Sequence, residues 1–412
     1  MSMNEKYVIV GGGLAGATAV QTLREEGAEG PITLLCGEQE LPYIRPPLSK
    51  DYLKDEVPRD SVFVHDQAWY DEHNVEVLLD APVGRVRPEA REVILTDGRI
   101  VDYSQVLLAT GSSARILDVP GADLEGVLSL RTLGDAERIK SALVDGQRMV
   151  VVGAGWIGLE VASAAREAGL DVVVVEVGDH PLERVLGPTV GGLFTDLHVQ
   201  HGVSMLMRSS VAELTGRAGR VTGARLESGV FLPADVVVVG VGAEPNVEVA
   251  AASDIPVKNG VLVDEYLATG LPGVYAAGDI AHAFHRHYAR HIRVEHWDNA
   301  KQQGAAAARN MLGQRAEYDR LPFFYSDQYD LGLEYTGWSP PGGFDKVVLR
   351  GDVNSFRFIA FWISRHRVVA AMNVNTWDVR PQLVDRIRSG AEVDNDALQD
   401  ADAELAVLAG AG

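Results

Sequence analysis

Short apolar runs alternate along the chain with longer amphipathic segments, and several of the runs end in glycine. The runs Tyr7–Val10 and Met149–Val152 each lead into a glycine-rich turn, after which apolar residues recur at helical spacing. A continuous apolar run is typical of a strand that is buried on both faces, so this alternation predicts parallel β-sheets covered by helices. The expected fold class is therefore α/β.

The two turns carry the same glycine spacing. Residues 11–16 read Gly-Gly-Gly-Leu-Ala-Gly and residues 153–158 read Gly-Ala-Gly-Trp-Ile-Gly, both of them G-x-G-x-x-G. In a strand–turn–helix unit the first glycine permits the tight turn, the second lets the backbone approach a pyrophosphate, and the third allows close helix packing. A second strand follows each turn, and an acid, Glu38 or Glu176, stands where a carboxylate can bind a ribose. Two copies predict two Rossmann-like dinucleotide-binding domains; the alternative is two glycine-rich turns in ordinary α/β units.

The C-terminal part of the chain has a different pattern. Residues 321 to about 390 contain short segments rich in Phe, Tyr, Val and Trp, separated by Gly-Gly, Arg-Gly-Asp and Arg-His-Arg. This pattern predicts an antiparallel sheet in an α+β domain. Residues 391–412 contain acids and alanines but no Lys or Arg, which predicts a partly helical or mobile tail without a catalytic role.

Charge and hydropathy narrow the possible partners. The 412 residues include 37 Lys plus Arg and 58 Asp plus Glu, a net charge of −21. Such a surface repels phosphates and anionic lipids, so neither a nucleic acid nor a membrane is expected as a partner. The N-terminus lacks the basic flank and long apolar stretch of a signal peptide, and apolar runs such as residues 236–243 are far shorter than the ~18 residues of a membrane span. We therefore expect a soluble cytoplasmic protein.

A single cysteine, Cys36, excludes an internal disulfide, a Cys-x-x-Cys redox pair, a thiolate zinc site and a protein-ligated iron–sulfur cluster. Any redox chemistry must therefore use a bound cofactor. Cys36 follows the second strand, and we interpret it as a small apolar packing residue rather than a catalytic thiol.

Further motifs make a family resemblance specific. Ala-Thr-Gly ends a strand at residues 109–111, and Ala-Ala-Gly-Asp ends another at residues 276–279. With the two glycine motifs, this set resembles the two-dinucleotide-binding flavoprotein reductases, which take FAD at the first site and NAD(P)H at the second. Four more segments are similar to the NADH-dependent ferredoxin reductases, the family of putidaredoxin reductase and biphenyl dioxygenase ferredoxin reductase, which is related to apoptosis-inducing factor. These segments are residues 42–50, 156–160, 295–300 and 324–329.

The resemblance implies a domain order and an activity. Residues 1–113 and 240–320 would form a discontinuous FAD-binding domain, residues 114–239 an inserted NAD-binding domain, and residues 321–412 a C-terminal domain. The chain would pass hydride from NADH to FAD and single electrons to a [2Fe–2S] ferredoxin that feeds a cytochrome P450 or a ring-hydroxylating oxygenase, as a monomer or homodimer. Flavin suits this task because it accepts two electrons together and releases them one at a time. The alternatives are an NADH diaphorase that reduces quinone, oxygen or rubredoxin, and an NADH-responsive conformational switch like apoptosis-inducing factor.

Two residues are the catalytic candidates that the resemblance implies. Lys50 would lie near flavin N5 and pair with Glu160, so that the lysine charge is fixed where negative charge develops on the reduced ring. The alternative is a surface lysine and a glutamate on a helix face. Arg45 and Arg131 would neutralise flavin phosphates or polar ring edges, and Asp279 would hold the ribityl chain. The alternative for each of these three residues is an ion pair in the packing between domains.

Two tryptophans remain open to more than one interpretation. Trp297 would lie beside the flavin ring, by stacking or by core packing. Trp156 would cover the flavin face until nicotinamide displaces it, or would serve only in packing between domains. The other cofactor contacts implied by the resemblance are Gly11, Gly13, Ala15, Gly16, Val83, Ala109, Thr110, Gly111, Gly153, Gly155, Ile157, Gly158, Arg184, Gly242 and Gly278.

Two charged features predict selectivity for coenzyme and partner. No arginine is adjacent to Glu176, so its carboxylate favours the ribose hydroxyls of NADH and opposes a 2′-phosphate. Residues 281–294 hold three arginines and four histidines without one acid, which predicts a docking patch for an acidic ferredoxin at Arg286, Arg290 and Arg293. The alternatives there are a solvated loop or a metal site at the histidines; no carboxylate or cysteine in the segment completes a coordination shell, so no metal is expected.

Overall fold

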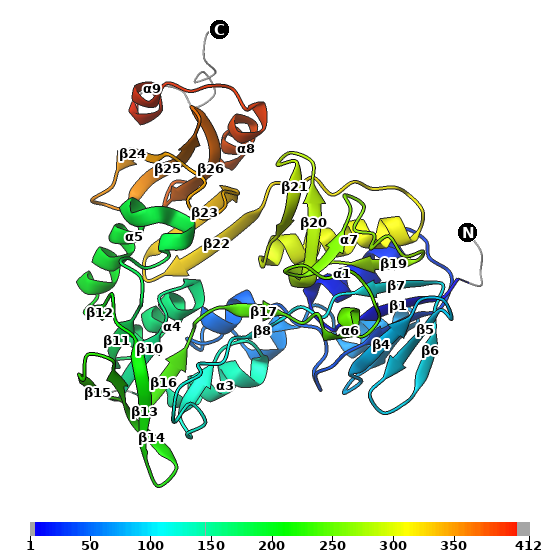
Figure 1. The fold of residues 1–412 in the computed structure, drawn as a ribbon, viewed down its shortest axis with the longest axis horizontal. Coiled ribbons are helices and arrows are strands. Elements are labelled where there is room, and N and C mark those ends of the chain that lie inside the picture. Colours follow the sequence, from blue (N-terminus) through cyan, green and yellow to red (C-terminus); the bar gives the residue numbers. More distant parts are fainter. Residues whose placement is uncertain (1–4, 145, 402–412) are drawn as a thin grey trace. The chain divides into compact units, whose positions relative to one another are not determined.

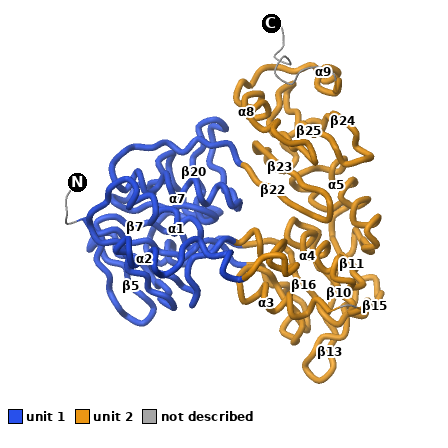
Figure 2. Tube along the Cα trace, turned by 180° about the vertical axis from the view of Figure 1, so that it is seen from behind, with its two compact units in different colours: residues 1–44, 59–113, 244–322 blue, residues 45–58, 114–243, 323–412 orange. Residues whose placement is uncertain are grey.

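The computed structural model describes residues 5–144 and 146–401, so the expectations for the first four residues and for the end of the acidic tail lie outside the described residues. The chain divides into two compact units (Figure 2). Unit 1 consists of Met1–Ile44, Arg59–Ser113 and Glu244–Pro322, and unit 2 of Arg45–Pro58, Ala114–Ala243 and Phe323–Gly412. Each unit contains one of the two glycine-rich motifs.

Unit 1 is built around a five-stranded parallel sheet. In spatial order its strands are β19 (Val274–Ala276), β7 (Gln105–Leu108), β1 (Tyr7–Val10), β2 (Ile32–Leu35) and β3 (Val75–Leu78). Helices α1 (Leu14–Glu25) and α7 (Trp297–Met311) pack against each other (Figure 1). The apolar strands are buried on both faces, as the unbroken runs predict, and Ile9, Val106 and Val274 belong to one core.

Smaller elements complete unit 1. Two three-stranded sheets have the orders β4-β5-β6 and β18-β20-β21, and the second ends in the β20–β21 hairpin. These elements are β4 (Val83–Arg87), β5 (Glu92–Leu95), β6 (Ile100–Asp102), β18 (Val261–Val263), β20 (Ala281–His285), β21 (Arg290–Arg293), α2 (Gln67–Glu72), α6 (Glu248–Ala251), η2 (Arg59–Val62) and η3 (Gly278–Ile280).

Unit 2 repeats the parallel architecture. In spatial order its strands are β12 (Ser204–Leu206), β11 (Asp171–Val175), β10 (Arg148–Val152), β16 (Val236–Val239) and β9 (Val127–Ser129). Its helical segments are η1 (Pro46–Ser49), α3 (Leu133–Ala142), α4 (Trp156–Glu167) and α5 (Glu183–Gln200). An antiparallel sheet of β13 (Val211–Arg217), β14 (Arg220–Leu226) and β15 (Phe231–Pro233) lies in the same segment of the chain.

The C-terminal part of unit 2 is the antiparallel sheet that its alternating aromatic segments predict. Its order is β22 (Phe323–Gln328), β23 (Leu331–Gly337), β26 (Arg367–Val374), β25 (Arg357–Ser364) and β24 (Lys346–Asp352), with helices α8 (Arg380–Ser389) and α9 (Asn395–Gln399). Trp362 is fully buried in this sheet and donates from Nε1 to the carbonyl oxygen of Leu186, 3.0 Å away.

The chain passes between the units along short strands. β8 (Ser112–Ala114) and β17 (Ala243–Pro245) pair with each other where the segment 114–243 begins and ends. The α/β class, the two Rossmann-like sheets and the C-terminal antiparallel sheet are confirmed. The three-domain division with its stated boundaries stays a prediction, because the two compact units group the chain differently.

Candidate functional site

The first glycine-rich motif shows which of its glycines the fold requires. Gly11 has a φ of 122°, and a Cβ there would overlap the carbonyl oxygen of Ala109. A Cβ at Gly16 would overlap the carbonyl oxygen of Gly11. Gly13 differs, because a Cβ there would meet no protein atom within 4 Å. The first and third glycines therefore serve packing, and the second leaves open space beside the backbone.

The second motif repeats this division. Gly153 has a φ of 99°, and a Cβ there would lie 2.5 Å from the carbonyl oxygen of Gly240. A Cβ at Gly158 would overlap the carbonyl oxygen of Gly153, whereas one at Gly155 would find its nearest protein atom 3.9 Å away. Helices α1 and α4 begin directly after these open glycines, without a side-chain cap and without an acid in the first turn. Uncapped helix N-termini beside open backbone fit a pyrophosphate group at both motifs.

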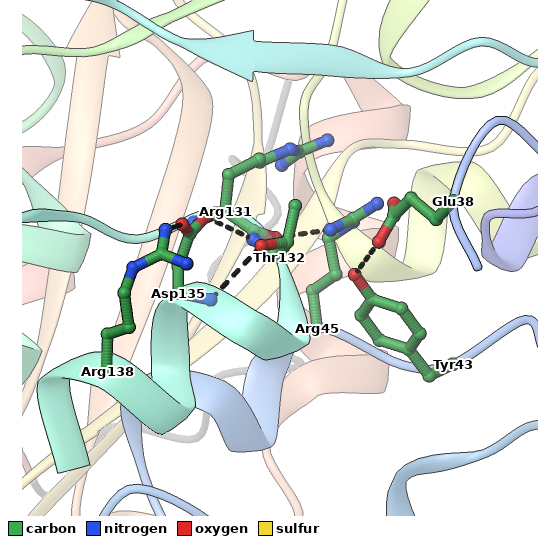
Figure 3. Close-up of polar contacts among 7 residues, drawn as sticks. All are labelled: Glu38, Tyr43, Arg45, Arg131, Thr132, Asp135 and Arg138. Atoms are coloured by element: carbon green, nitrogen blue, oxygen red, sulfur yellow. Dashed lines mark hydrogen bonds and ion pairs between the residues drawn. The ribbon is translucent and has the colours of Figure 1, made fainter. Parts of the chain in front are cut away.

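The two acids expected at ribose positions have different partners. Glu176 Oε2 accepts a hydrogen bond from the Ala154 amide at 2.7 Å, and Oε1 accepts one from the Gly178 amide at 2.8 Å. Glu176 is thus fixed at the edge of its own glycine motif. Glu38 is half-buried and accepts a hydrogen bond from the Tyr43 hydroxyl at 2.5 Å (Figure 3). Cys36 and Gly37 separate Glu38 from the end of β2 at Leu35, and the Tyr43 hydroxyl fixes its carboxylate there.

The carboxyl end of the unit 1 sheet gathers several polar residues. The Ser112 hydroxyl donates to Asp279 Oδ2 at 2.7 Å, and Asp279 is buried. Thr110 Oγ1 donates to the Asn246 carbonyl oxygen at 2.6 Å. The Gly278 amide donates to the side-chain oxygen of Gln303 at 2.9 Å. Ligands of open α/β sheets bind at this end of the strands, so the arrangement fits the expected cofactor position.

Arg131 is positioned by the start of helix α3 in unit 2. Thr132 and Asp135 form a capping box, in which Thr132 Oγ1 accepts from the Asp135 amide and Asp135 Oδ2 accepts from the Thr132 amide at 2.7 Å. Asp135 Oδ2 also accepts from the Arg131 amide at 3.0 Å, and Arg138 donates to Oδ1 (Figure 3). Arg45 donates to the Arg131 carbonyl oxygen, so the two arginines expected at the flavin belong to one cluster.

The ion pair expected between Lys50 and Glu160 is present. Lys50 Nζ lies 2.8 Å from Glu160 Oε2, and the two side chains are 9% and 3% exposed. The Ser49 hydroxyl also donates to Oε2 at 2.5 Å, and Ser326 donates to Oε1 at 2.6 Å. An unpaired charge at this depth is costly, so three donors stabilise the carboxylate. Lys50 Nζ also lies 5.6 Å from the centre of the Tyr325 ring.

The two tryptophans occupy different surroundings. Trp156 packs edge-on against Phe194 and Phe324, with ring centres 5.8 and 4.8 Å apart, all within unit 2. Trp297 is the first residue of α7 in unit 1, and Lys301 Nζ lies 5.2 Å from its ring centre. Both side chains are half-buried. The gating and stacking roles stay predictions.

The remaining residues implied by the resemblance fall in both units. Ala15 and Ala109 are buried, Val83 and Gly111 are half-buried, and all four belong to unit 1. In unit 2, Ile157, Arg184 and Gly242 are exposed.

Cys36 is 1% exposed, and burial raises the pKa of its thiol to about 12. A Cβ at Gly12 would meet Cys36 Sγ at 2.5 Å, so the thiol packs directly under the first motif. Packing therefore explains this residue, because a thiolate is strongly disfavoured here.

Within the described residues, no group of three or more His, Cys, Asp or Glu side chains is arranged to hold a metal ion.

The arginines expected to dock a partner lie on the β20–β21 hairpin of unit 1. Arg286 forms an exposed ion pair with Glu317 at 2.7 Å, and Arg293, whose side chain is only 13% exposed, forms an ion pair with Glu295. Arg290 is exposed at the first position of β21. The segment itself has no acid, but the fold brings acids from other positions to it, so its positive charge is smaller than the sequence suggests. The docking role stays a prediction.

Sequence reasoning assigned no role to several residues that contact the predicted site. Ser49 and Ser326 donate to Glu160, and Ser112 donates to Asp279. Ser49 and Ser326 lie inside segments that carried the family resemblance, so their positions were visible, but their contacts depend on the fold.

Comparisons with known proteins agree along nearly the whole chain. Residues 5–304 match the family model described as pyridine nucleotide-disulphide oxidoreductase, and residues 323–409 match one described as reductase C-terminal. Rhodocoxin reductase of Rhodococcus erythropolis is 40% identical over 89% of this chain and 86% of its own length. The ferredoxin–NAD⁺ reductase component of the anthranilate 1,2-dioxygenase system of Burkholderia cepacia is 39% identical over 90% and 91%.

A solved structure has the same fold. The covalent putidaredoxin reductase–putidaredoxin complex matches with a TM-score of 0.94 at 34% identity, covering 98% of each chain. Among the described residues no helix is both long and apolar enough to cross a membrane. The family's flavin and pyridine nucleotide fit the two glycine motifs. The chain belongs to the pyridine nucleotide-disulphide oxidoreductase family and, within it, to the ferredoxin reductases related to putidaredoxin reductase.

Proposed function

We propose that the protein is an FAD-containing NADH:ferredoxin oxidoreductase that serves a cytochrome P450 or a ring-hydroxylating oxygenase. One hydride from NADH carries two electrons and leaves NAD⁺. Two [2Fe–2S] ferredoxins each take one electron, and one proton is released to solvent. The names of the relatives support this proposal, since they include a ferredoxin–NAD⁺ reductase of a dioxygenase system and a reductase solved with putidaredoxin.

One observation carries the proposal: two dinucleotide motifs occur in a chain whose single cysteine is buried. Members of this family that use a redox disulfide need two cysteines, which this chain lacks. Electrons must therefore leave directly from the bound cofactor to an external acceptor. A one-electron acceptor such as a ferredoxin fits that requirement.

Each motif has a proposed ligand. In unit 1 the open backbone at Gly13, the Glu38–Tyr43 pair and the Ser112–Asp279 pair support FAD binding. In unit 2 the open backbone at Gly155 and the fixed carboxylate of Glu176 support NADH binding, although Glu176 must share its oxygens between backbone amides and a ribose hydroxyl. When bound, the flavin supplies the exchange between a two-electron donor and one-electron acceptors.

Lys50 and Glu160 are proposed to act at the hydride step. Glu160 holds the ammonium group of Lys50 in one place, where a fixed positive charge stabilises the negative charge that develops on the reduced ring. Lys50→Met and Glu160→Gln should each slow flavin reduction by NADH roughly 100-fold in stopped-flow experiments, with FAD still bound. Unchanged rates in both variants would assign the pair a structural role.

The hairpin of β20 and β21 is proposed to contribute to ferredoxin docking through Arg286, Arg290 and Arg293. Double substitution of Arg286 and Arg290 by Glu should raise the KM for ferredoxin and weaken its dependence on ionic strength. Activity from NADH to ferricyanide should be retained. An unchanged KM would place the docking surface elsewhere, and equal loss of both activities would indicate a folding or flavin-binding defect.

The decisive test is reconstitution with candidate acceptors. Purified protein should contain FAD, lose its flavin absorbance on addition of NADH, and reduce a [2Fe–2S] ferredoxin faster than a quinone, oxygen or rubredoxin at equal concentration. Faster reduction of one of those other acceptors would favour a diaphorase. Slow turnover with every acceptor and a long-lived charge-transfer absorbance would favour an NADH-responsive switch. A cytoplasmic location stays a prediction, to be tested by cell fractionation.

A further inference from the structure

A buried chain of hydrogen bonds lies behind Glu160 in unit 2. Strand β22 packs against helix α4 (Figure 1), and the Ser326 hydroxyl donates to Glu160 Oε1 at 2.6 Å. Gln328 Nε2 donates to Ser326 Oγ at 3.2 Å. Gln328 Oε1 lies 2.9 Å from His198 Nε2, and the Tyr329 hydroxyl lies 3.2 Å from His198 Nδ1. Glu160, Ser326, Gln328 and His198 are all 3% exposed or less.

The charge on Glu160 fixes the direction of every bond in this chain. A carboxylate only accepts, so Ser326 must give its one proton to Glu160 and accept from the Gln328 amide group. The Gln328 oxygen must then face His198, so His198 carries its proton on Nε2 and accepts from Tyr329 on Nδ1. Four donors in series therefore point toward one carboxylate, and each bond polarises the next.

The outer end of the chain is also built for this arrangement. Burial lowers the pKa of His198 to about 4, so the ring is neutral and can both donate and accept. Tyr329 has a φ of 55°, which is costly for a non-glycine residue. Its amide donates to Ser163 at 3.0 Å, and its ring stacks on His201 with centres 3.7 Å apart. These contacts hold the Tyr329 hydroxyl at His198.

We propose that Ser326, Gln328 and His198 are positioning residues that keep Glu160 charged and aimed at Lys50. This inference rests on the proposed function, because it matters only if the Lys50–Glu160 pair serves flavin reduction. This chain of hydrogen bonds explains the Ser-x-Gln pattern in residues 324–329. Alternate residues of a strand face the same side, and Ser326 and Gln328 are both buried.

Other charged and titratable groups act on the same pair. Asp51 and Lys54 come from the turn after Lys50, and Tyr325 and Asp327 lie on the opposite face of β22 from Ser326. Burial raises the pKa of Tyr325 to about 12 and raises the pKa of Asp327. Ser326 and Gln328 have no titratable group. Substitutions at these positions therefore change the hydrogen bonding of Glu160 without changing the net charge of the protein.

The first test measures the tautomer of His198 by ¹⁵N NMR of the FAD-loaded protein, with the signal assigned by its loss in His198→Gln. In the unsubstituted protein we expect the Nε2-protonated tautomer between about pH 5 and 9. Ser326→Ala breaks the link to the carboxylate and should give a mixture of tautomers, whereas Ser326→Thr keeps the hydroxyl and should restore the single form. Thr336→Val is the matched control, because it removes another fully buried hydroxyl of the same sheet that lies outside the chain.

The second test follows flavin reduction by NADH as a function of pH. Ser326→Ala should move the acidic limb of the rate profile upward by about one to two pH units, the size expected for a lost hydrogen bond to a charged group. His198→Gln should move it less in the same direction, because His198 lies two links further from Glu160 than Ser326 does. Ser326→Thr and Thr336→Val should leave it in place.

The outcomes separate this inference from the proposed function. If NADH does not reduce the flavin of the unsubstituted protein, the proposed function fails, but the tautomer of His198 still tests the chain. If reduction occurs and Ser326→Ala leaves both the tautomer and the pH profile unchanged, the positioning role is wrong. Equal shifts in Ser326→Ala and Thr336→Val would also overturn it, because they would reflect general loosening of the sheet.

Discussion

The two glycine motifs share a backbone but differ two residues after the third glycine, where α1 has Thr18 and α4 has Glu160. Both motifs use the first and third glycines for packing and leave the second open. The buried thiol of Cys36 packs against the first motif. Next to the second motif, hydrogen bonds between buried polar side chains run from Glu160 to His198. The same backbone motif thus supports two proposed nucleotide sites, and one acid, Glu160, with its buried hydrogen-bond partners distinguishes the site that is proposed to react.

The largest effect is expected at the third glycines, where the two motifs should behave alike. Gly16→Ala and Gly158→Ala each place a methyl group on a backbone carbonyl oxygen that cannot move cheaply, at a cost of roughly 3 kcal/mol or more. Thermal unfolding measures the loss, and hydrogen exchange locates it in unit 1 or unit 2. Gly37→Ala and Gly192→Ala are controls in open space. Normal stability of either third-glycine variant would remove the packing argument.

Of the two acids at the ribose positions, only Glu176 should affect the choice between NADH and NADPH. Repulsion between Glu176 and a 2′-phosphate is at most about 4 kcal/mol, or ~10³-fold, before screening by salt. NADH should therefore exceed NADPH in kcat/KM, and Glu176→Ala should narrow the ratio. Glu38→Ala, at the matching place in unit 1, should leave the ratio unchanged. Comparable values for both coenzymes in the unsubstituted protein would contradict the assignment of Glu176.

Acid should destabilise the protein through His198 in unit 2. The folded protein keeps His198 neutral down to about pH 4, whereas the unfolded chain binds a proton below about pH 6.5. The unfolded state therefore binds more protons in this window, and the free energy of unfolding falls as pH falls, by about 3 kcal/mol in all. Urea unfolding at several pH values measures the slope. His198→Gln should flatten it; an identical slope in that variant would assign the acid sensitivity to other groups.

The smallest effect is expected at the second glycine of each motif, Gly13 and Gly155. Substitution there should weaken binding of a different ligand at each motif and change stability little. Gly13→Ala and Gly155→Ala meet little protein, so stability should stay within about 1 kcal/mol of the unsubstituted chain. Each methyl group would displace a phosphate from a backbone amide, which should weaken binding roughly 10- to 100-fold. Gly13→Ala should weaken FAD binding and Gly155→Ala should weaken NADH binding, as measured by titration. The reverse pattern would exchange the two proposed sites.

Most of the fold could be predicted because its signals are local. The apolar runs and glycine motifs predicted both parallel sheets, and alternating aromatic segments predicted the C-terminal one. The Lys50–Glu160 pair came from resemblance, and the structure supplied its distance. Ion pairs between distant positions could not be predicted. Glu317 lies outside residues 281–294, so the sequence did not show that it neutralises Arg286, and the segment was expected to carry more positive charge than it does in the fold. The chain through Gln328 and His198 depends in the same way on tertiary packing.

The insertion of residues 114–243 between β7 and β19 also determines the order in which the strands of the unit 1 sheet are synthesised. Strand β1 is already made when β7 leaves the ribosome, but the other neighbour of β7, strand β19, is made only after the whole second parallel sheet. At ~5–20 residues per second, translation leaves that edge of β7 unpaired for on the order of ten seconds. During synthesis, the unit that is begun first is therefore completed only after the inserted sheet, and in that interval the unpaired edge of β7 is exposed to non-native strand pairing.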